Sequence, residues 1–160
     1  MKLSKIILPL LVTSFCFGLN ACTDDSKSTM PVVGDSYIYI GAYNFNNYFN
    51  AELKKEYDSD DSTNEYKYKI VVAPKSKRVK VMNGVITASF NVKFLYKLVA
   101  NTNAAYMLTQ SVDISIYSGS TMAISSIQTA TFDKPINEYP WFQASCSVLD
   151  ASGSILLTND

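Results

Sequence analysis

The sequence predicts an all-β domain, folded as an antiparallel β-sandwich of immunoglobulin-like architecture behind a cleaved signal peptide. Apolar and polar residues alternate with a period of two through most of the chain after residue 34, as in half-buried strands. Turn residues separate these runs at short intervals, which is typical of a sandwich or a barrel. Amphipathic helical periodicity is missing, apart from one ambiguous segment over residues 46–57. A closed, lipocalin-like meander barrel fits the same pattern and stays open as the alternative.

Residues 1–21 are predicted to be a signal peptide rather than part of the fold. Lys2 and Lys5 give a positively charged start, and a mostly apolar run follows over residues 6–19. That run is shorter than the roughly 20 apolar residues that a membrane-spanning helix needs. It fits the apolar region of a secretory signal, which is roughly 7–15 residues long and precedes cleavage at a small residue.

The end of this run, Leu19-Asn20-Ala21-Cys22, resembles the lipobox of bacterial lipoproteins. Asn20 departs from the small residue usual at its position, and the other three residues match. The resemblance implies that Cys22 carries a diacylglycerol on its sulfur, that cleavage follows Ala21, and that Cys22 becomes the acylated first residue. It also implies a lipid-anchored protein of the bacterial cell envelope. Thr23 stands where an aspartate would mark inner-membrane retention, which favours the outer membrane.

Residues 22–33 are expected to form the acylated N-terminus and a tether, and residues 34–160 a single β domain. The segment after Cys22 is short and polar, as a linker between a lipid and a domain should be. Several acyl chains together anchor a protein stably, whereas one chain gives only marginal binding. The membrane is therefore the first expected partner.

The composition argues against several classes of function. The chain has 14 basic and 14 acidic residues, and removal of Lys2 and Lys5 leaves 12 against 14, a net charge of −2. This balance argues against nucleic-acid binding, for which a strongly basic domain is typical. The chain has no histidine, and Cys146 is the only cysteine after Cys22. We therefore expect no intramolecular disulfide, no zinc site, no cofactor and no enzyme activity, because Ser and Cys nucleophiles need a general base.

Residues 37–72 are predicted to contain two strands with an ambiguous segment between them. Residues 37–43 are strand-like but apolar on both faces, whereas residues 46–57 could form one or two helical turns or an edge strand. The next strand has Lys67 and Lys69 on its outward face. Its inward residues are Tyr66, Tyr68, Ile70 and Val72.

A two-residue hairpin is predicted at Asn83-Gly84, because this dipeptide is the strongest short-range turn signal. Pairing outward from the turn places Val81 opposite Ile86, and the apolar residues of both runs then share one face. The second strand continues in phase as far as residue 98.

Three further strands follow. The first has the inward residues Tyr106, Leu108, Val112, Ile114 and Ile116. A strand over residues 121–132 changes phase near its middle, which predicts a bulge. The last long strand has the inward residues Phe142, Ala144, Cys146 and Val148. Residues 150–153 then predict a turn into a closing strand over residues 155–158.

The charge pattern is the main functional signal. Residues 66–112 hold eight basic residues and no acidic one. If the strands that carry them are neighbours, six of the eight form a basic outward face: Lys67, Lys69, Arg78, Lys80, Lys93 and Lys97. Such a face attracts anions, for example phospholipid headgroups, lipopolysaccharide phosphates or an acidic polymer. The competing interpretation is a solvated face whose lysines protect strand edges from aggregation.

Two other segments contain residue types found at binding sites. Residues 58–65 offer oxygen atoms at the spacing of a calcium loop, but Thr63 replaces the turn glycine and Lys69 the bidentate glutamate. We therefore predict an acidic surface loop. Aromatic residues among asparagines offer a sugar-binding or protein-binding loop, although tyrosine is also common in strands. They are Tyr43, Phe45, Tyr48 and Phe49.

The sequence thus predicts a membrane-anchored envelope lipoprotein whose non-enzymatic β domain binds a partner or supports an assembly. The alternatives are a lipocalin-like carrier of a small apolar ligand and a carbohydrate-binding module. A closed barrel with an apolar cavity would favour the carrier, whereas a filled two-sheet core would exclude it.

Overall fold

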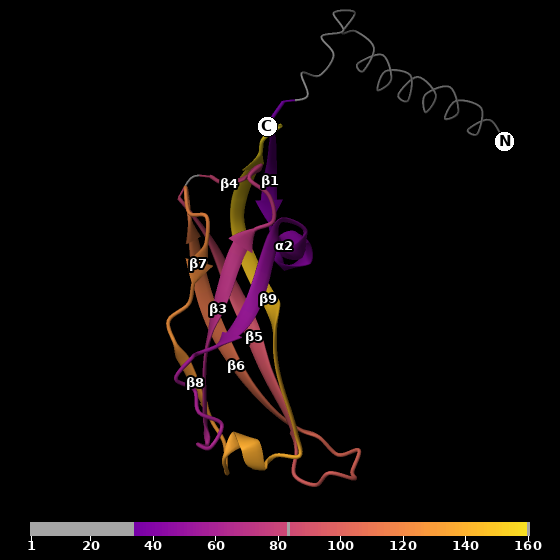
Figure 1. The fold of residues 1–160 in the computed structure, drawn as a ribbon. Coiled ribbons are helices and arrows are strands. Elements are labelled where there is room, and N and C mark those ends of the chain that lie inside the picture. The colour runs from indigo at the N-terminus through magenta and orange to yellow at the C-terminus, as the bar shows by residue number, and fades with distance from the viewer. Residues whose placement is uncertain (1–33, 83, 160) are drawn as a thin grey trace, which may run out of the picture. The chain divides into compact units, whose positions relative to one another are not determined.

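The computed structural model describes residues 34–82 and 84–159, which form two antiparallel sheets (Figure 1). In strand order, the larger sheet contains β1 (Ser36–Ile40), β9 (Trp141–Leu157), β5 (Val85–Lys97) and β6 (Tyr106–Tyr117), and β4 (Val79–Val81) also pairs with β9. The smaller sheet contains β2 (Phe49–Lys55), β3 (Glu65–Pro74), β7 (Ala123–Ile124) and β8 (Gln128–Thr131). The helices are α2 (Ala42–Tyr48) and the 3₁₀ turn η1 (Ile136–Glu138).

The predicted all-β fold is confirmed, and the alternative of a closed barrel is wrong. The strands of the described residues make two separate sheets, because no pairing joins one sheet to the other. The predicted signal peptide, Cys22 and the tether lie outside the described residues. Among the residues that are described, no helix has the length and apolar character needed to cross a membrane.

Strand alternation correctly predicted the core-facing residues of the central strands. On β3 the buried residues are Tyr66, Tyr68, Ile70 and Val72, and on β5 they are Ile86, Ala88, Phe90, Val92 and Phe94. The ring of Phe94 lies edge-on to Tyr66 and to Tyr68, with 5.4 Å between ring centroids in both pairs. The inner faces of the two sheets therefore pack against each other, and the outward residues of β3 and β5 point in opposite directions.

The ambiguous segment, residues 46–57, contains the end of α2 and the whole of β2, and α2 begins at Ala42, within the run 37–43 that was expected to be a strand. Asn44 stabilises the start of α2, because its Oδ1 accepts a hydrogen bond from the Gly41 backbone N–H at 2.9 Å and its Nδ2 donates one to the Tyr39 carbonyl at 2.9 Å. Phe45 is fully buried and stacks on Phe49 with 5.0 Å between centroids. The interpretation of these two phenylalanines as a sticky loop is therefore wrong, since both belong to the core.

The hairpin predicted at residues 83–84 is wrong, although residue 83 itself lies outside the described residues. Both β4 and β5 pair antiparallel with β9, through Val81 with Ile155 and Thr87 with Ser152. The chain therefore continues in one direction along β9 instead of reversing.

The alternation pattern could not distinguish these two arrangements. The buried positions shift from odd numbers in β4 to even numbers in β5, and a two-residue hairpin would produce the same shift. Gly84 adopts a positive φ, +110°, which glycine tolerates without a steric cost. Here Gly84 lies between β4 and β5, which run in the same direction along β9 and bury alternate positions of different parity.

The turn predicted at residues 150–153 is also wrong, because β9 runs through it as one strand of 17 residues. A bulge opposite Ser89 and Phe90 leaves Leu149 exposed. Gly153 adopts φ +150°, and a Cβ atom there would lie 2.6 Å from Cγ1 of Ile86. Glycine allows β9 to pass Ile86 at close range without ending the strand.

The phase change predicted within residues 121–132 corresponds to a break between β7 and β8, which both pair with β3. Ser125 fills the break. Its backbone N–H donates to the carbonyl of Ile70 at 2.9 Å, and its Oγ accepts from the N–H of Ile70 at 3.0 Å.

Candidate functional site

The six basic residues predicted to form one face are divided between the two sheets. Lys67 and Lys69 lie on the outer face of β3, in the smaller sheet. The other four belong to the larger sheet or to the residue just before β4: Arg78, Lys80, Lys93 and Lys97. Because the inner faces of the sheets pack together, the two sets point away from each other, and the single basic face does not form.

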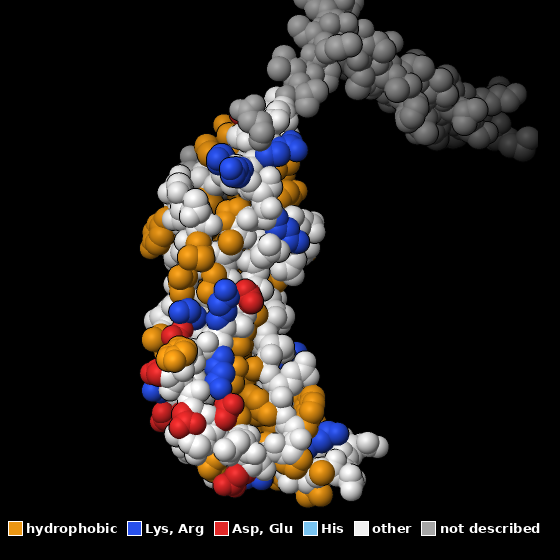
Figure 2. Space-filling view, in the orientation of Figure 1, with side chains coloured by type: hydrophobic (Ala, Val, Ile, Leu, Met, Phe, Trp, Pro, Cys, Tyr) orange, Lys and Arg blue, Asp and Glu red, His pale blue; other side chains and the backbone are white. Residues whose placement is uncertain are grey.

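The basic residues of the smaller sheet stand beside acidic partners. Lys69 Nζ lies 2.8 Å from Glu56 Oε1, and Lys67 Nζ lies 3.5 Å from Asp58 Oδ2. In the view of Figure 2, with the smaller sheet in front, blue and red side chains are mixed over the lower half of the molecule. The positive charge of this face is therefore offset locally.

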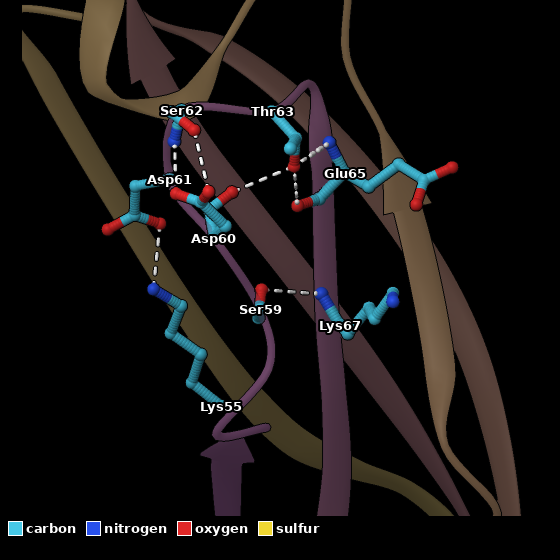
Figure 3. Close-up of polar contacts among 8 residues, drawn as sticks. All are labelled: Lys55, Ser59, Asp60, Asp61, Ser62, Thr63, Glu65 and Lys67. Carbon is cyan, nitrogen blue, oxygen red and sulfur yellow. Dashed lines mark hydrogen bonds and ion pairs between the residues drawn. The ribbon is translucent and has the colours of Figure 1, made fainter.

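The acidic loop between β2 and β3 satisfies its own oxygen atoms (Figure 3). The carboxylate of Asp60 accepts hydrogen bonds from the Ser62 hydroxyl at 2.7 Å and the Ser62 backbone N–H at 2.8 Å, which lower the pKa of Asp60. Asp61 pairs with Lys55 at 2.8 Å. Internal contacts of this kind agree with the predicted acidic surface loop.

The basic residues of the larger sheet form two groups separated by acids. On β5, Ser89 donates a hydrogen bond to Asp113 Oδ1 at 2.6 Å, and it pairs with Asp150 on β9. Arg78 and Lys80 lie toward one end of the sheet from this point, whereas Lys93 and Lys97 lie toward the other. The ammonium of Lys97 lies 5.7 Å from the ring of Trp141.

Arg78 and Lys80 lie close to the point at which the chain enters the domain. Leu157 pairs with Ser36 of β1 on one side and with Val79 of β4 on the other. One residue earlier, Leu156 lies between Tyr37 and Lys80. Paired residues share a face of the sheet, so Tyr37, Leu156 and Lys80 form one row across its outer surface.

Tyrosine side chains extend this row along β1. Tyr37 is 73% exposed and Tyr39 61% exposed, and the Tyr39 hydroxyl lies 3.0 Å from Ser152 Oγ. A Cβ atom on Gly41 would lie 2.9 Å from Cε1 of Tyr43. The ring of Tyr43, which is 83% exposed, therefore occupies the space where the next outward side chain of β1 would stand.

We call this surface the β1–β4 face. Its members are Tyr37, Tyr39, Tyr43, Arg78, Lys80 and Leu156. Arg78 Nε donates to the Thr158 carbonyl at 2.6 Å, which holds the guanidinium at the edge of the sheet. Within residues 34–82 and 84–159, neither Arg78 nor Lys80 forms an ion pair. Asp35, just before β1, is an acidic residue near this surface.

Sequence reasoning named Arg78, Lys80 and Tyr43 but did not connect them with Tyr37 and Tyr39. One signal was present, since residues 37–43 are apolar on both faces. A strand that is apolar on both faces has one face in the core and another exposed to a partner or to water. The pairing with β9, which joins the tyrosines to the basic residues, is not encoded in the alternation.

A hollow of about 580 Å³ opens beside β4. Residues of the β3–β4 turn, β4 and the loop after β6 line it, including Lys77, Val79, Met82 and Gly119. Its lining also includes Lys80 of the β1–β4 face, Pro74 at the end of β3 and the core-facing Val81. The core between the sheets is filled by the aromatic side chains described above.

Cys146 lies on β9 in the half-buried row with Phe142 and Val148. Burial raises the pKa of its thiol, which lowers the fraction of reactive thiolate. Among the described residues there is no group of three or more His, Cys, Asp or Glu side chains placed to hold a metal ion.

No family model, curated protein or solved structure matches this chain.

Proposed function

We propose that this protein is a lipid-anchored, non-enzymatic binding protein of the bacterial cell envelope, and that its β1–β4 face binds an anionic envelope component. In this proposal Cys22 carries the lipid, the outer membrane is the anchoring membrane, and the domain is an immunoglobulin-like sandwich. Nucleic acid is not a proposed partner, because the net charge of the chain after residue 21 is −2.

One observation carries the binding function: Arg78 and Lys80 share a surface with three exposed tyrosines and form no ion pair with any described residue. A guanidinium binds phosphate or carboxylate oxygens in a planar, bidentate manner. Exposed tyrosine rings add contact area and one hydroxyl each. This combination suits a partner with negative charges next to an apolar or carbohydrate surface.

The anchor is tested by changing Cys22 to alanine in the full-length chain. We expect the native chain to remain with the membrane fraction and to yield an acylated N-terminal cysteine by mass spectrometry, whereas the Cys22→Ala chain is not lipidated. Recovery of native chain that retains Met1 and carries no lipid would contradict this part of the proposal.

The binding function is tested by retention on dextran sulfate, a soluble anionic polymer coupled to a column. The Arg78→Gln/Lys80→Gln chain should elute at lower salt than the native chain, because exposed charge attraction is screened by salt. The matched control is Lys67→Gln/Lys69→Gln, which removes the same charge from the opposite sheet. If the control elutes earlier than the Arg78/Lys80 variant, the β1–β4 face is not the binding surface.

Carbohydrate binding is a second candidate function, favoured by the row of Tyr37, Tyr39 and Tyr43. Exposed aromatic rings on β1 and at the start of α2 can stack on sugar rings. Calorimetry with a neutral envelope glycan distinguishes the two functions. Binding that is insensitive to salt and is lost in Tyr39→Ser, but kept in Arg78→Gln, would favour the carbohydrate.

A further inference from the structure

We propose that the anionic component bound by the β1–β4 face is the surface of the bilayer that anchors the chain, so that the domain lies with this face against its own membrane. This inference rests on the proposed function and names the partner of the same site. Three features of the domain support it: the place of chain entry, the chemistry of the face and the charge of the opposite side.

The place of chain entry brings the face close to the lipid. Residues 23–34 connect Cys22 with Asp35, and twelve residues span at most about 40 Å. β1 starts one residue later, and its first residue, Ser36, pairs with Leu157 beside β4. A lipid on Cys22 therefore keeps Tyr37, Arg78 and Lys80 within the reach of a short tether, which raises their effective concentration at the bilayer.

The chemistry of the face matches a lipid–water interface. Tyrosine is enriched at this interface because its ring is apolar and its hydroxyl is polar. Arg78 and Lys80 are available for lipid phosphates, and Leu156 adds an apolar side chain between Tyr37 and Lys80. The face thus presents rings and cations together, as a headgroup layer requires.

The charges elsewhere on the domain define which side faces the membrane. The smaller sheet points away from the β1–β4 face and continues into the acidic loop, which contains Asp58, Asp60 and Asp61. On the larger sheet, Asp113 and Asp150 mark the limit of the basic group. An anionic surface repels both acidic regions, so contact through the end that carries Arg78 and Lys80 is the favourable orientation.

The test uses a lipid-free chain of residues 22–160 with Cys22→Ser. The buried hydrophobic residues of the described structure lie between Ile40 and Ile155, so this chain keeps the whole core. It is mixed with vesicles of phosphatidylcholine alone or with phosphatidylglycerol added. We expect binding that depends on phosphatidylglycerol and weakens with salt, and hydrogen-exchange protection over residues 36–43 and 153–157.

The variants identify the face. Each basic residue near an anionic membrane increases partitioning onto the vesicles by roughly fivefold. Arg78→Gln/Lys80→Gln should therefore lower partitioning by about 25-fold. Tyr37→Ser/Tyr39→Ser should also lower it, without changing its salt dependence. Lys67→Gln/Lys69→Gln, with the same change in net charge, should leave partitioning within about twofold of the native chain.

Two results would overturn the inference. One is equal binding to both kinds of vesicle, or protection confined to β2 and β3. The other is retention on dextran sulfate through Arg78 and Lys80 without any vesicle binding, which leaves the proposed function standing and assigns the face to a polymer. Loss of the anchor is detected separately by the Cys22→Ala chain.

Discussion

The outer face of the smaller sheet and the β1–β4 face carry the same kind of basic residue in different surroundings. Lys67 and Lys69 lie within 3.5 Å of acidic side chains from the segment that follows β2. Arg78 and Lys80 lie among exposed tyrosines, without an ion pair in the described part of the chain. A count of basic residues therefore overestimates how strongly the outer face of the smaller sheet attracts anions, and it does not single out the β1–β4 face. The reason is that a basic side chain beside an acidic one attracts a partner much less than a basic side chain without an ion pair.

The largest expected effect comes from the glycine that allows β9 to support the β1–β4 face. Gly153→Ala places a Cβ atom 2.6 Å from Ile86 Cγ1 and 2.9 Å from Ile86 Cα, at φ +150°. We expect a loss of about 3 kcal/mol in the free energy of unfolding, from overpacking and backbone strain. Urea titration of the native and Gly153→Ala chains measures this loss.

The control for this effect is Gly119→Ala. Gly119 also has a positive φ, +80°, but no atom lies within 4 Å of its added Cβ. Gly119→Ala should lower the free energy of unfolding by only about 1 kcal/mol, because the backbone strain is its only cost. Equal losses at the two glycines would show that β9 does not pass Ile86 as closely as described.

A smaller effect is expected at a side-chain hydrogen bond between the two sheets. Tyr68 of β3 donates from its hydroxyl to Gln110 Oε1 of β6 at 2.6 Å, and Tyr68→Phe should cost about 1 kcal/mol. Burial raises the pKa of Tyr68 to about 12, above the value near 10 of an unfolded chain. The neutral phenol therefore stabilises the fold fully below pH 10, and this contribution is lost as pH rises from 10 to 12.

Urea midpoints at pH 9 and pH 11.5 check this prediction. The native chain should lose more stability across this interval than Tyr68→Phe. If both chains respond equally to pH, then Tyr68 is not the group that couples alkaline titration to the contact between the sheets.

The smallest expected effect comes from replacing one lysine on each of the two faces. Lys69→Gln removes the partner of Glu56, whose side chain is only 15% exposed, and should cost about 0.5 kcal/mol. Lys80→Gln removes no ion pair between described residues and should leave the free energy of unfolding unchanged within error. A larger loss at Lys80 than at Lys69 would reverse the comparison and imply an interaction of Lys80 within the fold.

Sequence alternation predicted which residues face the core but not which strands are neighbours. The inward residues of β3 and β5 followed directly from the period of two, because burial depends on the residue type at each position. The neighbour of β4 depends on whether the chain reverses at residue 83. Both arrangements bury Val81 and Ile86, so the pattern was equally satisfied by the hairpin and by pairing with β9.

The same limit affected the candidate site. The basic residues and Tyr43 were visible in the sequence, but a shared face requires the strand order, which comes from long-range pairing with β9. The start of the short helix at Ala42, within residues expected to form a strand, was missed for a different reason. Seven residues carry too little periodicity to reveal it, and the Asn44 side chain that supports its start acts through backbone groups.

The strand order also has a consequence for the time at which the domain can fold. β9, which lies between β1 and β5, is the last strand of the described residues. During synthesis, the larger sheet therefore lacks its central strand until residues 141–157 have been made. Pairing between the first and last strands is also slow, because a long loop must close. A nascent chain with this strand order therefore stays unfolded for longer than one in which neighbouring strands follow each other in the sequence.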